Sequence, residues 1–350
     1  MTNITKPAEA KPILEVKNLT KEFYPEGKLF GGKKENPVKA VSDISFSVCE
    51  GETFGVVGES GCGKTTLGRC IARGIEATSG EVILYEKDGN YFDFLKAKGD
   101  KYKELRKRVQ MIFQDPYSSL DPRMTVYDII SEPLKACYNL KRDEINERVK
   151  QIAQKTEIDM RFLKRYPHAF SGGQRQRIGI ARALITLPDL IICDEPVSAL
   201  DVSIQAQIIN LLKDLQTEYN STYIFIAHDL SVVEYISDRV AVMYLGKIVE
   251  LAPTEELYMY PKHPYTEALL SAVPIADPET KKSRIIIKGE VPNPSNPPAG
   301  CHFHPRCKYM SEKCQHIMPE LTELENGHFV SCHYAEQLKL KGIEKIELRA

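Results

Sequence analysis

The sequence predicts an α/β fold built on a parallel sheet, with a β region before it, an inserted helical region and a small C-terminal extension. Three observations predict this fold. A glycine-rich loop at 58–66 joins a short apolar run to a helical pattern, an apolar run at 190–193 ends in two carboxylates, and the stretch 115–187 between them is mainly helical. Continuous apolar runs of this kind are typical of parallel strands that are covered on both faces.

The loop has the sequence Gly58-Glu59-Ser60-Gly61-Cys62-Gly63-Lys64-Thr65-Thr66. It matches G-x-x-x-x-G-K-S/T, and it lies between strand and helix as that motif requires. Glycines let backbone N–H groups surround phosphate oxygens, and the helix N-terminus adds its positive dipole end. Lys64 can reach the β and γ phosphates, and the Thr65 hydroxyl can hold Mg²⁺. The loop therefore predicts a nucleoside triphosphate site, against the simpler interpretation as a glycine-rich turn.

Composition describes an ordinary globular protein of 350 residues, with 42% hydrophobic and 27% charged residues. This length predicts two domains, or one large and one small. The formal net charge of −1 provides no field towards nucleic acid or anionic lipid. The sequence holds no apolar run of 18 residues and no apolar signal region near its start, so we expect a cytosolic protein. Nine cysteines in a cytosolic chain favour buried thiols or metal ligands over disulfides.

The first part of the chain reads as β structure. Residues 13–48 contain alternating apolar positions, and further strands are expected at 80–84 and 109–113. Phe23 lies upstream of the loop and either stacks on an adenine ring or belongs to the core. The lysine- and arginine-rich segment 96–108 predicts a solvated helix face, with contact to phospholipid headgroups as the alternative. The last of these strands ends at Gln114.

Two later stretches carry candidate chemistry. Ser171-Gly172-Gly173-Gln174 opens a helix, so its bare N–H groups are either a second phosphate-binding candidate or a structural turn. Asp194 and Glu195 follow a buried strand, where parallel strands direct side chains into the ligand crevice. Asp194 suits the Mg²⁺ shell, and Glu195 suits a base for an attacking water; the alternative is a pair of surface charges. His228 follows the strand 223–226 and can touch a γ-phosphate.

In this order, the loop 58–66, Gln114, Ser171–Gln174, Asp194-Glu195, Ser198–Asp201 and His228 resemble the ATP-binding cassette family over residues 13–250. The resemblance implies a RecA-like phosphate-loop NTPase core with an N-terminal antiparallel β subdomain. It further implies that Phe23 stacks on adenine and that Gln114 links Mg²⁺ to a permease. Ser171 to Gln174 would bind the γ-phosphate of the other subunit in a head-to-tail dimer. Glu195 would be the general base, and His228 the switch on the γ-phosphate.

Further segments are similar to the oligopeptide and dipeptide importers, and to the F-type ATPase of the two that such importers carry. They are residues 114–122, 201–207, 263–266, 289–292 and 296–301. The resemblance implies a nucleotide-binding domain at 12–255 with an inserted helical subdomain at 115–187, and an extension at 256–350. The chain would hydrolyse ATP to power peptide import through a permease, on the cytoplasmic side of the cell membrane.

The resemblance also implies partners: a second, homologous ATPase in a heterodimer, two transmembrane permease subunits and, indirectly, an extracellular peptide-binding protein. It implies no nucleic acid, and contact with the membrane only through the permease. Two alternatives stay open, a soluble cassette ATPase that is not coupled to transport and an importer of another solute such as nickel or glutathione. A nucleotide kinase would have no use for Ser171–Gln174.

Four cysteines crowd the C-terminal extension at Cys301, Cys307, Cys314 and Cys332. No two of them form the short C-x₂-C pair of a zinc ribbon, although proline and glycine turns can bring the loops together. Four thiolates of this kind suit an iron–sulfur cluster, and the importer resemblance implies a 4Fe–4S cluster there. Zinc, with nearby histidines as substitute ligands, and free or paired thiols are the alternatives.

Overall fold

The computed structural model describes residues 11–24, 36–86, 88–273 and 284–343. Two sheets dominate these residues. The smaller sheet has the order β2 (Val38–Cys49), β1 (Pro12–Phe23), β4 (Ser79–Tyr85) and β5 (Tyr91–Asp93), and its pairs are antiparallel. The larger sheet has the order β11 (Thr322–Glu325), β12 (His328–Val330), β10 (Lys247–Pro253), β9 (Arg239–Tyr244), β3 (Thr53–Val57), β8 (Thr222–Ile226), β7 (Leu190–Asp194) and β6 (Val109–Ile112).

The central strands of the larger sheet are parallel, from β6 through β7, β8 and β3 to β9. Their register sets the position of the site, because Ile226 of β8 lies opposite both Val56 of β3 and Asp194 of β7. The carboxyl ends of three strands therefore meet at one edge of the sheet. Strands β10, β12 and β11 pair antiparallel beyond β9, so the sheet as a whole is mixed.

Both faces of β3, β7, β8 and β9 are buried, which explains their mainly apolar sequences. Successive side chains point to opposite faces of a strand. Phe225 and Val242 accordingly pack into one core with the helices, while Ile224 and Ala241 pack into a second core with the smaller sheet. The rings of Phe46 in β2 and Phe54 in β3 stack in that second core, with centroids 4.7 Å apart.

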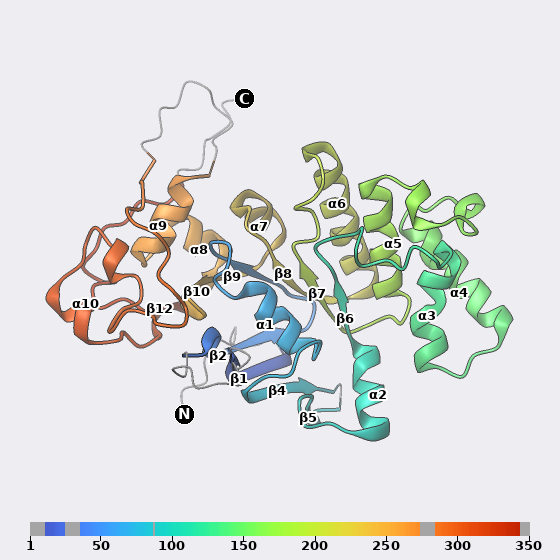
Figure 1. Ribbon diagram of the computed structural model, residues 1–350, viewed down its shortest axis with the longest axis horizontal. Coiled ribbons are helices and arrows are strands. Elements are labelled where there is room, and N and C mark those ends of the chain that lie inside the picture. Colours follow the sequence, from blue (N-terminus) through green and yellow to red (C-terminus); the bar gives the residue numbers. More distant parts are fainter. Residues whose placement is uncertain (1–10, 25–35, 87, 274–283, 344–350) are drawn as a thin grey trace, which may run out of the picture.

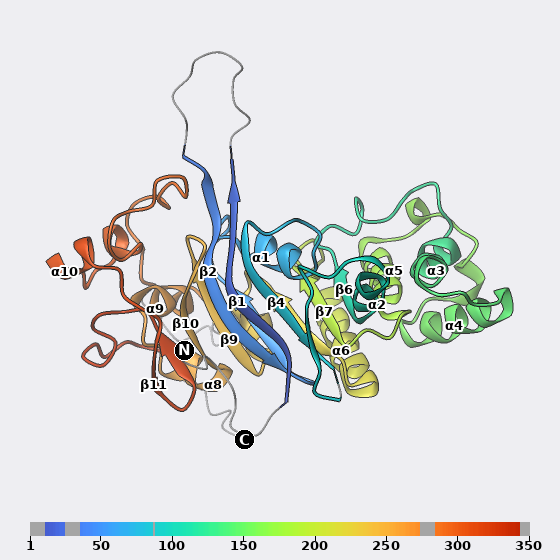
Figure 2. The ribbon, with the colours of Figure 1, turned by 90° about the horizontal axis from the view of Figure 1, so that it is seen from below.

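Ten α-helices connect and cover the described strands: α1 (Lys64–Ile71), α2 (Gly99–Arg108), α3 (Val126–Cys137), α4 (Arg142–Lys155), α5 (Gly172–Leu184), α6 (Val202–Tyr219), α7 (Leu230–Ile236), α8 (Thr254–Met259), α9 (Pro264–Ser271) and α10 (Glu312–His316). Short 3₁₀ turns lie at Met160–Phe162, Pro167–Ala169 and His304–Arg306. Helices α3, α4 and α5 gather at one end of the molecule, and α9, α10 and β12 at the other (Figure 1). Strands β2, β1 and β4 run side by side in the view from below (Figure 2). No helix within the described ranges is long and apolar enough to cross a membrane.

The C-terminal residues are built into the main fold. Strand β12 pairs with β10, so the segment after residue 320 widens the larger sheet. His328 Nε2 lies 2.7 Å from Glu250 Oε1 in this buried region. Phe303 packs into the same core as the central strands. The extension therefore depends on the rest of the chain for its core.

The two sheets are joined by a buried ion pair. Arg239 at the start of β9 donates from Nε to Glu52 Oε1 at 2.6 Å and from Nη2 to the carbonyl of Ser47 in β2 at 2.7 Å. The side chains of Arg239 and Glu52 are only 9% and 7% exposed. A buried carboxylate is stable only while it is paired.

Replacing Arg239 by Met should therefore lower the free energy of unfolding by about 3–5 kcal/mol, because Glu52 loses its buried counter-charge. The control is Lys155→Ala, which breaks the exposed pair with Glu218 and should cost less than about 1 kcal/mol. Urea unfolding of both variants measures the difference. Equal losses of unfolding free energy in the two variants would show that the buried pair contributes no more to stability than the exposed one.

Candidate active site

The phosphate loop follows β3 and leads directly into the first turn of α1. Gly58 and Gly63 have φ angles of 150° and 107°. A Cβ at Gly58 would lie 2.2 Å from the carbonyl oxygen of Met243, and one at Gly63 would lie 2.0 Å from that of Ala40. Since both neighbours are backbone atoms, neither position has room for a side chain. Two carbonyls far away in the sequence thus explain two of the motif's glycines.

Lys64 fills the inside of this loop. Its side chain is buried, and Nζ donates to the carbonyl oxygen of Gly58 at 2.7 Å and of Glu59 at 3.1 Å. The ammonium group is therefore held where the loop curves, among the backbone groups expected to surround phosphate oxygens.

Thr65 and Asp194 meet across the edge of the sheet. Thr65 Oγ1 donates to Asp194 Oδ1 at 2.8 Å. Asp194 is 1% exposed, and burial raises the pKa of its carboxyl group. Its second oxygen, Oδ2, is buried without a hydrogen-bond partner among the described residues. A hydroxyl beside an unpartnered carboxylate oxygen is a donor set that fits Mg²⁺, which prefers oxygen ligands and usually takes one or two carboxylates from the protein.

Glu195 brings together two more of the predicted residues. Its Oε2 accepts from Gln114 Nε2 at 2.7 Å and lies 3.3 Å from His228 Nδ1. The backbone of Glu195 has a φ of 46°, a sparsely populated region for a residue with a side chain, and its N–H donates to the carbonyl of Ile226 at 2.9 Å. Such strain is common at functional sites. The ends of β6, β7 and β8 therefore place three candidate residues in contact.

Two predicted groups lie apart from this cluster. Ser171 caps α5, with Ser171 N–H donating to Gln174 Oε1 at 3.0 Å and Gln174 N–H donating to Ser171 Oγ at 3.4 Å. Strands β6 and β7 lie between α1 and α5 in both views (Figures 1 and 2). A Cβ at Gly173 would lie 2.5 Å from Ile204, and one at Gly172 3.3 Å from Leu200, so this turn packs against the start of α6.

Phe23 ends β1 with 42% of its surface exposed. It lines a cavity of about 500 Å³ that is also formed by the C-terminal segment. The lining residues are Phe23, Tyr24, Asn36, Val38, Asn293, Ser295 and Asn296.

Comparisons with known proteins agree with this geometry. Residues 41–198 match the family described as ABC transporter, and residues 249–314 match the oligopeptide/dipeptide transporter, C-terminal region. The chain is 51% identical over 328 residues to the oligopeptide transport ATP-binding protein AppF of Bacillus subtilis, covering 93% of this chain and 98% of that relative. It is 52% identical over 325 residues to OppF of Haemophilus influenzae, covering 91% and 96%. This chain belongs to the ABC transporter family.

Among solved structures, the chain is similar to the ATP-binding cassette MJ0796, in a dimeric structure of a post-hydrolysis state bound to ADP and Pi. The TM-score is 0.59 and the identity 28%, covering 69% of this chain and 98% of that chain. The predicted cassette fold and the resemblance to the oligopeptide ATPases are confirmed. A soluble cassette ATPase outside transport is not favoured by these relatives.

The predicted iron–sulfur cluster at Cys301, Cys307, Cys314 and Cys332 is wrong. Within the described ranges, no group of three or more His, Cys, Asp or Glu side chains is arranged to hold a metal ion. The four cysteines are free. Burial raises the pKa of the Cys307 thiol to about 11 and that of Cys332 to about 12, so both are protonated thiols at neutral pH. The spacing of the four cysteines in the sequence did not reveal that their thiols are buried in this way.

Two residues that contact the phosphate loop were not predicted. Tyr265 Oη accepts from the N–H of Glu59 at 2.8 Å, and Arg306 pairs with the Glu59 side chain at 2.7 Å. Both lie in segments that the sequence singles out for other reasons, 263–266 and the cysteine-rich region. No local pattern connects either segment to the loop.

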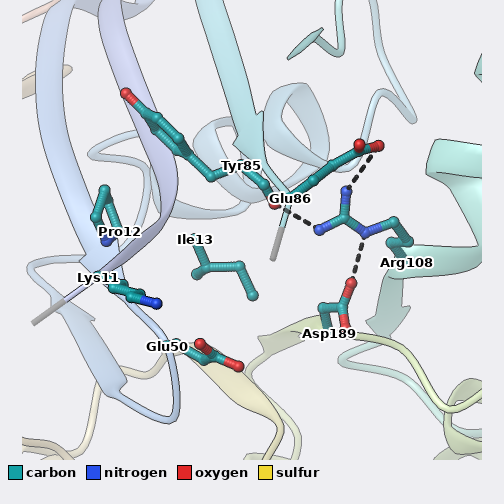
Figure 3. A pocket seen from close by; sticks show the side chains of 8 residues that line it. All are labelled: Lys11, Pro12, Ile13, Glu50, Tyr85, Glu86, Arg108 and Asp189. Carbon is teal, nitrogen blue, oxygen red and sulfur yellow. Dashed lines mark hydrogen bonds and ion pairs between the residues drawn. The ribbon is translucent and has the colours of Figure 1, made fainter. Parts of the chain in front are cut away.

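The basic segment 96–108 ends at a cavity of about 230 Å³ (Figure 3), which lies at the end of β7 opposite to Asp194. Arg108 there pairs with Asp189 and donates to the Tyr85 carbonyl at 2.6 Å. Asp189 precedes β7 and Asp194 ends it, so the two carboxylates are separated by the strand's length of roughly 16 Å. Arg108 thus ties α2 to both sheets, away from the candidate site.

The raised pKa of Asp194 leads to a test of its role. Its folded-state pKa lies above the unfolded value, so ionising it costs the folded state, and its contribution to stability falls as the pH rises through that range. Asp194→Asn should therefore make the nucleotide-free chain more stable at pH 7 and should weaken its binding of Mg²⁺ with nucleotide. Urea unfolding between pH 4.5 and 7.5 measures the first effect. A variant less stable than wild type at pH 7 would contradict it.

Proposed function

We propose that this chain is the ATP-hydrolysing subunit that powers import of oligopeptides or dipeptides through a membrane permease. The observation that carries the proposal is the meeting of Thr65, Asp194 and Glu195 at one edge of the sheet, next to the phosphate loop. Half of the aligned sequence is identical to relatives named oligopeptide transport ATP-binding proteins.

ATP binding uses groups from three regions. Phe23 stacks on the adenine, the backbone N–H groups of residues 58–66 surround the phosphates, and Lys64 moves from the loop carbonyls to the β and γ phosphates. Thr65, Asp194 and Gln114 hold Mg²⁺, which neutralises charge on the phosphate oxygens when it is bound. The unpartnered Asp194 Oδ2 supports this assignment.

Hydrolysis is centred on Glu195. Its carboxylate accepts a proton from the attacking water, whose oxygen forms a bond to the γ-phosphorus while the bond to the ADP oxygen breaks. His228 contacts the γ-phosphate and acts as the switch that responds to it. The short contacts of Glu195 with Gln114 and His228 support these roles, because all three side chains face the same place.

A second subunit completes the site. Ser171 to Gln174 of one subunit bind the γ-phosphate held by the other in a head-to-tail pair. The position of Ser171 and Gln174 supports this, since both are exposed at the N-terminus of α5, where the helix dipole favours an anion. We infer that the partner is a second, homologous ATPase, that the pair docks on two permease subunits at the cytoplasmic side of the membrane, and that an extracellular peptide-binding protein delivers the cargo.

The chain divides, in this proposal, into a nucleotide-binding domain at 12–255 and an extension at 256–350. The helices of residues 115–187 form an inserted subdomain that carries Ser171–Gln174 and contacts the permease together with Gln114. Their position at one end of the larger sheet supports this division (Figure 1).

Glu195→Gln keeps the shape of the side chain and removes the base. In the assembled transporter it should retain ATP binding and lower the hydrolysis rate by roughly 10²–10⁴-fold. Lys64→Ala should lose binding and turnover together, because it removes a charge that contacts the phosphates. Phosphate release and nucleotide binding measured on the same preparations separate the two effects. Wild-type turnover by Glu195→Gln would refute its role as base.

Native mass spectrometry of the purified complex tests the partners. We expect one copy of this chain, one different ATPase and two permease subunits. Two copies of this chain with no second ATPase would contradict the heterodimer, and a chain that never co-purifies with an integral membrane protein would contradict the importer.

A further inference from the structure

A side chain from the cysteine-rich region reaches the phosphate loop. Arg306 Nη1 and Nη2 donate to Glu59 Oε2 at 2.7 Å and Oε1 at 3.1 Å. The side chain of Arg306 is 7% exposed and that of Glu59 is 27% exposed. Two parallel hydrogen bonds between a guanidinium and a carboxylate fix orientation as well as distance. The pair therefore constrains the loop residue that follows Gly58.

The backbone of Glu59 is held at two further points. Its N–H donates to Tyr265 Oη at 2.8 Å, and its carbonyl accepts from Lys64 Nζ at 3.1 Å. Tyr265 is fully buried, and burial raises the pKa of its hydroxyl well above the usual value, so it stays neutral. One residue of the loop is thus attached through its side chain, its N–H and its carbonyl.

A cluster of aromatic rings keeps these anchors in place. The ring centroids of Tyr244 and Tyr265 are 4.8 Å apart, and Phe303 lies 5.3 Å from each of them. Arg306 Nη1 also donates to Tyr244 Oη at 3.4 Å. Since Phe303 and Arg306 lie on one short stretch, packing of the ring fixes the guanidinium beside the loop.

We propose that Arg306, with Tyr265, is a positioning residue that shapes the phosphate loop for the triphosphate. The inference rests on the proposed function, in which this loop binds ATP. Arg306 acts in two ways. It holds the loop in one arrangement before the nucleotide arrives, which reduces the entropy lost on binding. It also neutralises the Glu59 carboxylate, whose unpaired negative charge would repel the phosphates.

The second effect makes a sharp test possible. Arg306→Gln leaves the Glu59 carboxylate without its partner, whereas Glu59→Gln removes that charge. Arg306→Gln in the full chain should weaken binding of Mg·ATP about tenfold, the effect of losing one charge-assisted contact. The double variant Glu59→Gln with Arg306→Gln should bind within about threefold of wild type, because no unpaired charge is left. Isothermal titration calorimetry measures all of these affinities.

The matched control is Lys308→Gln. Lys308 lies two residues after Arg306 and pairs with Glu267 of α9 at 3.1 Å, away from the phosphate loop. This variant removes a positive charge from the same region and should keep wild-type affinity. In the assembled transporter, Arg306→Gln should raise the KM for ATP with little change in kcat, since Glu195 is untouched. If Arg306 had only a structural role, Arg306→Gln would lower the amount of folded protein without changing the KM for ATP.

The outcomes separate this inference from the proposed function. A wild-type chain that fails to bind Mg·ATP would overturn both. If wild type binds and Arg306→Gln binds equally well, or if adding Glu59→Gln does not restore affinity, the positioning role alone is wrong. Should Arg306→Gln fail to fold, Glu59→Gln decides, because it leaves the positive charge of Arg306 unopposed beside the phosphates and should strengthen the binding of Mg·ATP. Unchanged or weaker affinity of Glu59→Gln would overturn the inference.

Discussion

The parallel register of β3, β7 and β8 is the constraint on which the rest of the structure depends. Ile226 lies opposite both Val56 and Asp194, so three strands end at the same level. The phosphate loop follows the first strand, Asp194 ends the second with Glu195 directly after it, and His228 follows the third. Parallel strands require crossovers, and the helices that supply them cover the faces of the sheet. The parallel pairing of the strands therefore causes both the meeting of the candidate site residues at one edge and the burial of the two faces of the sheet.

The burial of the Asp194 carboxylate near that edge lowers the stability of the fold, and the proposed function of the site explains why it is kept there. Asp194 is almost fully buried, its carboxyl group has a raised pKa, and one of its oxygens has no hydrogen-bond partner in the part of the chain that the structure describes. Glu195 has a strained backbone conformation. Local violations of the ordinary rules concentrate at functional sites, where the rest of the fold compensates for them. The Arg239–Glu52 pair differs, because both of its charges are satisfied and join the two sheets.

The C-terminal residues take part in the fold and in the candidate site. Strand β12 extends the larger sheet, Phe303 joins its core, and Arg306 contacts the phosphate loop. Asn293 and Asn296 line the same cavity as Phe23. A segment with few apolar residues gains order by packing on an existing core. That dependence explains the order of its described residues, among which no metal-binding group is found.

The sequence by itself determined the features that depend on neighbouring residues. The loop 58–66 needs only its glycines, lysine and threonine between a strand and a helix, and the apolar run before Asp194 and Glu195 marks a buried strand. Only the tertiary structure decided which distant groups meet. Met243 and Ala40 approach two loop glycines, Arg306 pairs with Glu59 across 247 positions, and the thiols of the extension lie in buried surroundings without a metal site among the described residues. The physical reason is that such contacts depend on packing between segments, which no local spacing encodes.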